Sequence, residues 1–270
     1  MAQAAPTRIA DAGASVLLRE DAGGVATLTL NRPDQYNALS SSLIAALQSA
    51  VSDLERDESV RVVVIAGAGK AFCAGHDLKE MHEHADSQFA QEAFERCQRV
   101  MIDLTRLPQP VIARVHGAAY AAGCQLVAQC DLAVAATEAR FATSGVNYGL
   151  FCSTPGVPLA RNIPRKHAMD MLLTGEPIDA ATALAWGLVN RVVPADRLDA
   201  EVQALARSII AKSRAVIASG KKTFYQQLND NLEQAYRVAT AAMVDNVKTE
   251  DGKEGIAAFV KKRKPRWKNK

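Results

Sequence analysis

Two segments of this chain share one pattern, in which a strand of buried type runs into a turn rich in glycine and alanine and then into a helix. The first segment covers residues 62–78 and the second covers residues 111–126. In each, a β-branched run ends in small residues, which let the backbone approach a ligand closely. The N–H groups at a helix start have no partner within the helix and can stabilise a negatively charged oxygen. The two segments therefore predict an α/β fold with a paired hydrogen-bond-donor site.

Hydrophobic periodicity predicts alternating strands and helices through most of the chain. Strands are expected at residues 25–30, 62–65, 111–115 and 131–135. Helices are expected after the capping serines 40–42, over residues 94–104 and over residues 122–128. Units of this kind stack either into a layered spiral or into another α/β core. From about residue 206 the pattern is wholly helical.

Composition adds few constraints. The chain has 270 residues, of which 49% are hydrophobic, enough for one large domain or two small ones. Its net charge of +3 comes mostly from Lys and Arg after residue 260. We expect that stretch to be a solvated, frayed terminus rather than a nucleic-acid arm, because little aromatic interleaving accompanies it. The five cysteines lack CxxC spacing, which indicates buried thiols in a reducing compartment.

Several other classes are disfavoured. No apolar run reaches the ~18 residues of a membrane span, and residues 1–14 lack the features of a secretory signal or transit peptide. We therefore expect a cytoplasmic protein without a membrane span. The Gly67-Ala68-Gly69 run lacks the third glycine of a dinucleotide fingerprint. His76, His82 and His84 have no carboxylates at a spacing that would complete a metal site, so neither a metal nor a separate cofactor is expected.

Further short motifs follow the same order along the chain as those of a known family. They are the runs at residues 31–33, 37–39, 173–178, 185–189 and 254–259. Each is weak alone, but with the two turns they resemble the crotonase superfamily, the enoyl-CoA hydratase/isomerases. The runs at residues 122–126, 145–157 and 242–246 look most like the subgroup of enoyl-CoA hydratase domain-containing protein 3.

This resemblance implies a fold and a ligand. It implies a crotonase-type ββα spiral core over residues 1–205 that binds acyl-CoA, and a C-terminal helical region over residues 206–270 that forms trimers, commonly paired into hexamers. The apolar stripe of that region fits packing within one chain equally well. The implied activity is that of an acyl-CoA lyase, with coenzyme A as part of the substrate. A eukaryotic member would reside in the mitochondrial matrix.

The resemblance also implies a set of site residues. It places two oxyanion donors at the backbone N–H groups of His76 and Ala122. It assigns contacts with CoA and the acyl group to Gln35, Tyr36, Ala38, Ala74, His76, Asp77, Leu78, Tyr120, Gly123, Phe259 and Lys262. Residues 35–38 would hold the adenine-ribose end, and Phe259 and Lys262 would lie near a phosphate, often across a subunit boundary. Asp77 is also expected to cap the helix that opens at Leu78.

Hydratases of this superfamily hold a water molecule between two glutamates, at positions that match Gln125 and Gly145. Gln125 can bind water but cannot take its proton, and Gly145 has no side chain. Because a positioned acid or base contributes about 10² to 10⁴ in rate, efficient ordinary hydration is disfavoured. His76 is the first candidate to substitute, because an imidazole ordinarily titrates near neutrality. The alternative is that His76 only forms part of the pocket wall.

Three functions remain open at this point. The chain is an acyl-CoA lyase, decarboxylase or hydrolase, a slow or atypical enoyl-CoA hydratase that uses water bound to Gln125, or a noncatalytic acyl-CoA binder. Cys152 and Ser153 follow the Gly145 segment and are either nucleophiles or pocket lining. Neither has an activating base within its local motif.

Overall fold

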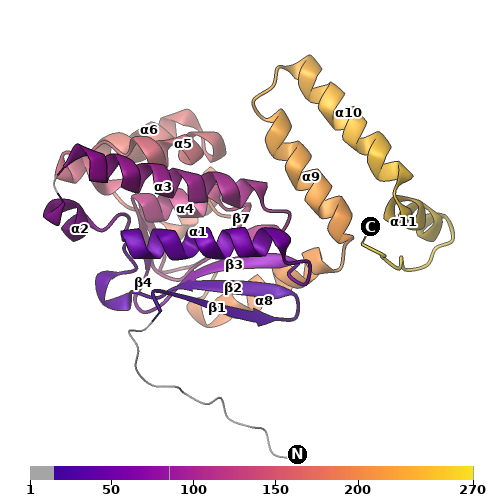
Figure 1. Ribbon diagram of the computed structural model, residues 1–270, viewed down its shortest axis with the longest axis horizontal. Helices are drawn as coiled ribbons and strands as arrows, with labels where there is room; N and C mark the ends of the chain where they lie inside the picture. The colour runs from indigo at the N-terminus through magenta and orange to yellow at the C-terminus, as the bar shows by residue number, and fades with distance from the viewer. Residues whose placement is uncertain (1–14, 85, 270) are drawn as a thin grey trace, which may run out of the picture.

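The computed structural model describes residues 15–84 and 86–269, which form two β-sheets and the helices around them (Figure 1). The strands are β1 (Leu17–Ala22), β2 (Val25–Leu30), β3 (Val62–Gly67), β4 (Ala71–Cys73), β5 (Val111–Val115), β6 (Ala118–Tyr120), β7 (Leu132–Ala136), β8 (Arg140–Ala142), β9 (Ile178–Asp179) and β10 (Arg191–Val193). The expectation that residues 1–14 carry no targeting signal lies outside the described residues.

The α-helices fall into a group around the sheets and a C-terminal group. The first group is α1 (Ser41–Arg56), α2 (Leu78–Glu83), α3 (Ser87–Arg106), α4 (Ala122–Gln129), α5 (Ser153–Asn162), α6 (Arg165–Thr174), α7 (Ala180–Trp186) and α8 (Leu198–Ile210). The second is α9 (Arg214–Gln227), α10 (Leu232–Lys248) and α11 (Glu250–Val260). Short 3₁₀ helices are η1 (Pro33–Gln35), η2 (Ser144–Tyr148) and η3 (Ala195–Arg197).

The chain winds as a spiral in which each turn gives one strand to each sheet. The larger sheet has the order β1-β2-β3-β5-β7-β10, and the smaller has the order β4-β6-β8-β9. The successive pairs β3/β4, β5/β6 and β7/β8 therefore lie in parallel register on their neighbours in both sheets. Of the two arrangements that the sequence left open, the structure has the layered ββα spiral.

Strand β3 illustrates why this sheet lies inside the protein. All of its residues from Val62 to Ala66 are buried, as is typical of a parallel strand covered on both faces. Val63 and Ile65 pack in the core that α1 and α3 cover, whereas Val62 and Val64 pack against α8 on the opposite face. The alternation of period two thus distributes one β-branched run between two cores.

Helix α8 runs through the boundary predicted at residues 205 and 206. Leu198, Val202, Leu205 and Ala206 all pack in the core below the larger sheet. The helices that follow, α9 to α11, stand to one side of the sheets (Figure 1). Large apolar side chains are exposed along them, namely Phe224, Leu228, Leu232, Tyr236, Met243, Val244, Val247, Ile256, Phe259 and Val260.

A buried polar cluster joins α9 to the sheet core. The Lys221 amine donates to Asp131 Oδ2 at 2.6 Å and to the backbone oxygens of Leu104 and Gln109. The Tyr225 hydroxyl donates to the other carboxylate oxygen of Asp131 at 2.8 Å. Because the Lys221 side chain is only 7% exposed, the ion pair is shielded from water. This cluster fixes the start of the C-terminal group on its own core.

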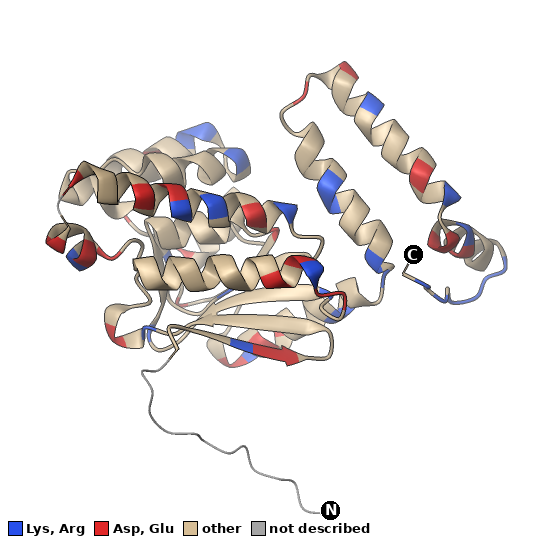
Figure 2. Ribbon diagram, viewed as in Figure 1, with Lys and Arg blue, Asp and Glu red and all other residues tan. Residues whose placement is uncertain are grey.

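Residues 261–266 of the basic terminus are exposed, as expected, but the expectation of fraying is wrong for residues up to 269. Buried Asp251 accepts hydrogen bonds from the backbone N–H groups of Lys268 and Asn269. The Trp267 indole donates to the backbone oxygen of Ala211, and Arg263 pairs with Glu254. In Figure 2 this basic tail returns from α11 toward the start of α9. The carboxylates of α11 are the partners that a reading of local charge missed.

All five cysteines are buried and free, as predicted. Within residues 15–84 and 86–269 no helix is long and apolar enough to cross a membrane. The same residues contain no group of three or more His, Cys, Asp or Glu that could hold a metal ion.

Candidate functional site

The two small-residue turns lie against each other. Gly75 has a φ of +103°, and a Cβ built on it would lie 3.3 Å from Ala122 N and 2.8 Å from Ala121 Cβ. A Cβ on Gly123 would lie 2.1 Å from the backbone oxygen of Cys73. Real Cβ atoms do not lie 2.1 Å from a backbone oxygen, so position 123 requires glycine. Position 75 requires it because of the positive φ and the close approach to Ala121 Cβ.

Each turn leaves one backbone N–H group open. On either side of His76, Leu39 N donates to Gly75 O at 2.7 Å and Asp77 N donates to Leu39 O at 3.2 Å. The N–H groups of His76 and Ala122 donate to no acceptor within the described part of the chain. Ala122 is the first residue of α4, where an N–H group has no partner inside the helix. Two neighbouring donors are thus available to a ligand.

Both donor residues line one cavity of about 500 Å³, which we call the turn cavity. Its lining is Ala74, His76, Leu78, Met81, Phe94, Ala121, Ala122, Ser144, Gly145, Tyr148, Gly149, Leu150, Phe151, Cys152, Ser153, Thr154 and Pro155. None of these residues is Asp, Glu, Lys or Arg. A cavity of this size with a mainly apolar lining is typical of small-molecule sites.

His76 presents a buried nitrogen that has no partner. Its Nε2 is buried without a hydrogen bond, and its ring packs edge to face on Phe94 with centroids 5.0 Å apart. Burial lowers the pKa of His76 to about 4, because a charged imidazole would lose its hydration. The expectation that His76 titrates near neutrality is therefore wrong. The imidazole is neutral at pH 7 and acts as a neutral donor or acceptor.

The two positions without glutamate differ in their surroundings. Gln125 is 5% exposed, and its Oε1 has no partner. At Gly145 a Cβ would lie 2.4 Å from the backbone oxygen of Leu150 and 2.7 Å from Cys152 Sγ. A side chain at position 145 would therefore require the 145–152 loop to move, whereas position 125 already holds a side chain as long as glutamate.

Cys152 lies at the Gly145 end of the cavity. Its Sγ accepts the Gly145 N–H group at 3.2 Å. Burial raises the pKa of the Cys152 thiol, so the nucleophilic thiolate is disfavoured at neutral pH. Lining is thus the better interpretation of Cys152.

The predicted cap at Asp77 is confirmed. Its Oδ1 accepts the N–H groups of Lys79 and Glu80 at the start of α2. Its Oδ2 pairs with Arg32 Nη2 at 2.8 Å. Arg32 also donates to the backbone oxygen of Ala38 at 2.6 Å. This ion pair fastens the 32–38 segment to the first turn, and no local pattern in the sequence signals it.

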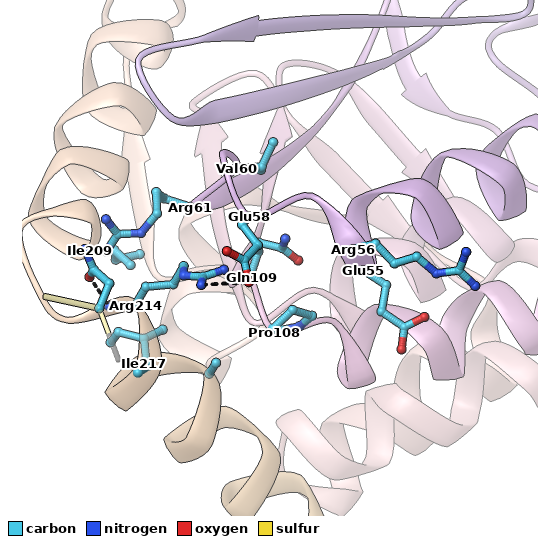
Figure 3. A pocket seen from close by; sticks show the side chains of 13 residues that line it. Glu55, Arg56, Glu58, Val60, Arg61, Pro108, Gln109, Ile209, Arg214 and Ile217 are labelled. Carbon is cyan, nitrogen blue, oxygen red and sulfur yellow. Dashed lines mark hydrogen bonds and ion pairs between the residues drawn. The ribbon is translucent and has the colours of Figure 1, made fainter. Parts of the chain in front are cut away.

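A second cavity, of about 330 Å³, lies between the C-terminal end of α1 and the start of α9, and we call it the junction cavity (Figure 3). Its lining combines apolar residues with charged ones, and three of the charged residues have partners. Arg214 bonds Glu58 at 3.2 Å, and Arg61 donates to the backbone oxygens of Ile210 and Lys212. Gln109 donates to the backbone oxygens of Leu54 and Asp57 but leaves its Oε1 unpartnered. None of the predicted site residues lines this cavity.

Comparisons with known proteins match this geometry. The family profile described as enoyl-CoA hydratase/isomerase matches residues 20–270. The chain belongs to the enoyl-CoA hydratase/isomerase family. A solved structure named enoyl-CoA hydratase, from Mycobacterium smegmatis, is 54% identical with a TM-score of 0.92, covering 93% of this chain and 98% of that one. Human enoyl Coenzyme A hydratase domain-containing protein 3 is 47% identical with a TM-score of 0.91, covering 93% of this chain and all of that one (100%).

Curated relatives agree with the solved structures. The mouse protein named enoyl-CoA hydratase domain-containing protein 3, mitochondrial, is 48% identical over 244 residues, which are 90% of this chain and 81% of that protein. A Dictyostelium discoideum protein named probable enoyl-CoA hydratase, mitochondrial, is 35% identical over 93% of this chain and 90% of its own length. The crotonase fold and the likeness to the domain-containing protein 3 subgroup are thereby confirmed.

Most residues that the enoyl-CoA hydratase/isomerase resemblance assigned to CoA lie near the turns. Residues 35–38 run beside the first turn, where Ala74 N donates to Tyr36 O at 3.0 Å. Tyr120 lies at the end of β6, one residue before the Ala121-Ala122 turn. Phe259 and Lys262 lie at and beyond the end of α11, far from these turns (Figure 1). One copy of the chain does not bring them to the turn cavity.

Two residues of the turn cavity were missed by the sequence reasoning. Phe94, predicted only as a helix residue, holds the His76 ring. Ala121 has a φ of +47° and a ψ of −116°, a conformation that costs energy for any residue except glycine. The small-residue run signalled a tight turn here but did not identify the strained position.

Proposed function

We propose that this chain binds an acyl-CoA thioester in the turn cavity and stabilises a negative charge on the thioester oxygen through the backbone N–H groups of His76 and Ala122. The observation that carries the proposal is the pair of open N–H groups on adjoining turns that line one cavity. Each such donor contributes about 10²- to 10³-fold in rate where charge develops on oxygen. Residues 35–38, Ala74, Asp77 and Leu78 then hold the CoA portion, and Tyr120 and Gly123 border the acyl end.

The chemistry that follows differs from ordinary hydration. With Gln125 and Gly145 in place of two carboxylates, the site polarises the thioester but lacks the usual acid and base. We propose lyase-type chemistry on an enolate or oxyanion, in which the neutral His76 imidazole, with its unpartnered ring nitrogen, exchanges a proton. A slow hydratase, an acyl-CoA decarboxylase and a noncatalytic binder remain as alternatives.

The proposal includes an assembly. Phe259 is 84% exposed at the end of α11, and apolar side chains are exposed along α9 and α10. A homotrimer, or a dimer of trimers, would bury this surface and bring Phe259 and Lys262 of one copy to the CoA phosphates of another. The relatives named mitochondrial suggest a matrix location for a eukaryotic member and the cytoplasm otherwise.

The experiment measures binding and turnover on the full chain. Crotonyl-CoA, methylmalonyl-CoA and saturated acyl-CoA thioesters are titrated by calorimetry against free CoA, and product formation is followed for each. We expect saturable binding that is tighter for at least one thioester than for CoA. Binding without turnover would leave only the noncatalytic binder, and no preference over free CoA would contradict the proposal.

One variant tests the oxyanion donor itself. Ala122→Pro deletes the N–H group at the first position of α4, where helices accept proline. We expect turnover to fall by about 10²-fold or more. Arg165→Pro is the control for proline at a first helical position, at an exposed site in α6 outside the cavity. Because Ala122 is buried and follows the strained Ala121, the fall in turnover counts only if Ala122→Pro still binds free CoA as the parent does. Equal turnover in Ala122→Pro and the parent would contradict the assigned donor.

A carboxylate can be returned at one of the two positions only. Gly145→Glu would clash with the backbone oxygen of Leu150, so it cannot report on chemistry alone. Gln125→Glu keeps the side-chain length and adds the base. If the scaffold is otherwise that of a hydratase, this variant should hydrate crotonyl-CoA faster than the parent. A variant that binds crotonyl-CoA but hydrates it no faster than the parent would contradict the slow-hydratase alternative.

A further inference from the structure

The charge of the turn cavity indicates which acyl groups it takes. All of its lining residues are neutral at pH 7, since none is Asp, Glu, Lys or Arg and burial keeps the pKa of His76 at about 4. Arg32, which lies beside the first turn, is already paired with Asp77. No cation of the lining is therefore available to a charged acyl end.

Backbone dipoles do not replace the missing cation. Helix α5 begins at the cavity, and a helix N-terminus ordinarily attracts anions. Here Ser153 N already donates to Phe151 O at 2.7 Å, and Gly156 N donates to Cys152 O at 2.9 Å. Pro155 has no N–H group, so Thr154 alone could offer a first-turn donor. Most N–H groups at the start of α5 therefore already have acceptors in the preceding loop or are absent.

The free energies of desolvation and of helix-end stabilisation together disfavour a carboxylate at the acyl end. Taking a carboxylate out of water without a cation costs several kcal/mol, whereas a helix end returns about 0.3–2 kcal/mol. Apolar side chains such as Leu78, Met81 and Phe94 face an uncharged chain at no such cost. Leu150 and Phe151, each half exposed, continue the apolar lining toward solvent.

We propose that the turn cavity selects thioesters with uncharged acyl groups and rejects acyl groups that end in a carboxylate. This inference rests on the proposed binding of acyl-CoA at the same site. It makes the decarboxylase alternative unfavourable, because the substrates of such an enzyme carry a carboxylate next to the thioester.

The test compares two four-carbon thioesters that differ in terminal charge. Butyryl-CoA, succinyl-CoA and free CoA are titrated into the full chain by calorimetry at pH 7. We expect butyryl-CoA to bind at least 30-fold more tightly than succinyl-CoA, roughly the effect of leaving one charge unpaired. Equal affinities for the two thioesters, both above that of CoA, would overturn this inference and leave the proposed function intact. If neither exceeds CoA, both fail.

A variant that introduces a positive charge gives a second test of the selectivity. Phe151→Lys places an ammonium at the mouth of the cavity, where the aromatic ring is half exposed. Succinyl-CoA affinity should rise about tenfold relative to butyryl-CoA. Leu173→Lys is the matched control, since Leu173 is exposed on α6 and does not line the cavity. An equal gain in both variants, or none in Phe151→Lys, would count against selection inside the cavity.

Discussion

The turn cavity and the junction cavity differ in whether their polar side chains have partners. In the junction cavity Arg214 pairs with Glu58 (Figure 3). Arg61 donates to two backbone oxygens. In the turn cavity the lining carries no charge, and the His76 ring nitrogen is buried without a partner. Buried polar groups are nearly always paired in native proteins, so an unpartnered one requires an explanation.

The difference separates a structural site from a ligand site. Charges at the junction hold α9 on the sheet core and are used by the protein itself. The open N–H groups of His76 and Ala122 and the unpaired His76 nitrogen cost stability until a ligand or water satisfies them. At the junction Gln109 Oε1 also has no partner, but the amide nitrogen of the same side chain donates to two backbone oxygens at the end of α1. The comparison predicts large stability effects at the junction and binding effects at the turns.

The largest effect is expected where the buried polar cluster that joins α9 to the sheet core is broken. Lys221→Met leaves the largely buried Asp131 carboxylate without its cation and should lower the free energy of unfolding by about 4 kcal/mol. Urea unfolding of the parent and variant measures this loss. Lys222→Met, at an exposed neighbouring position of α9, is the control and should change stability by less than about 0.5 kcal/mol. Similar small losses in both would refute the role of the cluster.

The next effect tests close packing between the two turns. Gly123→Ala puts a Cβ 2.1 Å from the backbone oxygen of Cys73 and should cost about 3 kcal/mol of stability. It should also weaken acyl-CoA binding, because the turn that carries the Ala122 N–H group must move. Gly220→Ala is the control in α9, where no atom lies within 4 Å, and a gain of about 0.5–1 kcal/mol is expected there. A tolerated Gly123→Ala would refute the close approach.

The sequence predicted the turns that the second of these predictions tests, but not the ion pair that the first one tests. The strand-turn-helix pattern predicted the turns, because each is encoded by about 15 consecutive residues whose burial and size follow local rules. It also predicted the Asp77 cap. The Lys221–Asp131 pair joins residues 90 positions apart, and the return of the tail to Asp251 depends on a carboxylate of α11. Local patterns hold no information on such partners.

The same limit applies inside the site. The spacing predicted that His76 follows the first turn, but the low pKa comes from burial against Phe94 and other residues that fold over it. Likewise, Gly145 was recognised as a missing glutamate. That its backbone lies too close to Leu150 O for any side chain depends on how the 145–152 loop folds back on itself, which the sequence pattern does not show.

An effect of intermediate size is expected from the titration of His76. The unfolded chain takes up a proton as the pH falls through about 6.5, whereas the folded chain does not until about 4, so stability is lost across this window. Between pH 8 and pH 5 the loss should be about 2 kcal/mol. In His76→Gln this part of the pH dependence should be absent, while His82→Gln, exposed on α2, should keep it. The measurement is urea unfolding at the two pH values, and an unchanged profile in His76→Gln would mean that the imidazole is not buried neutral.

The smallest effect concerns the strained residue between the two turns. Ala121 at φ +47° and ψ −116° stores about 1–3 kcal/mol of backbone strain, which glycine would release at an entropic cost of about 0.5–1 kcal/mol. Ala121→Gly should therefore stabilise the fold by about 1 kcal/mol in urea unfolding. Ala128→Gly, inside α4, should instead lose about 1 kcal/mol or more, because glycine is unfavourable in a helix. Opposite signs would show that conformation, and not residue size, distinguishes the two alanines. If Ala121→Gly also weakens butyryl-CoA binding, the strained alanine serves to hold the Ala122 N–H group toward the thioester, and a variant that loses stability instead would show that the turn is relaxed.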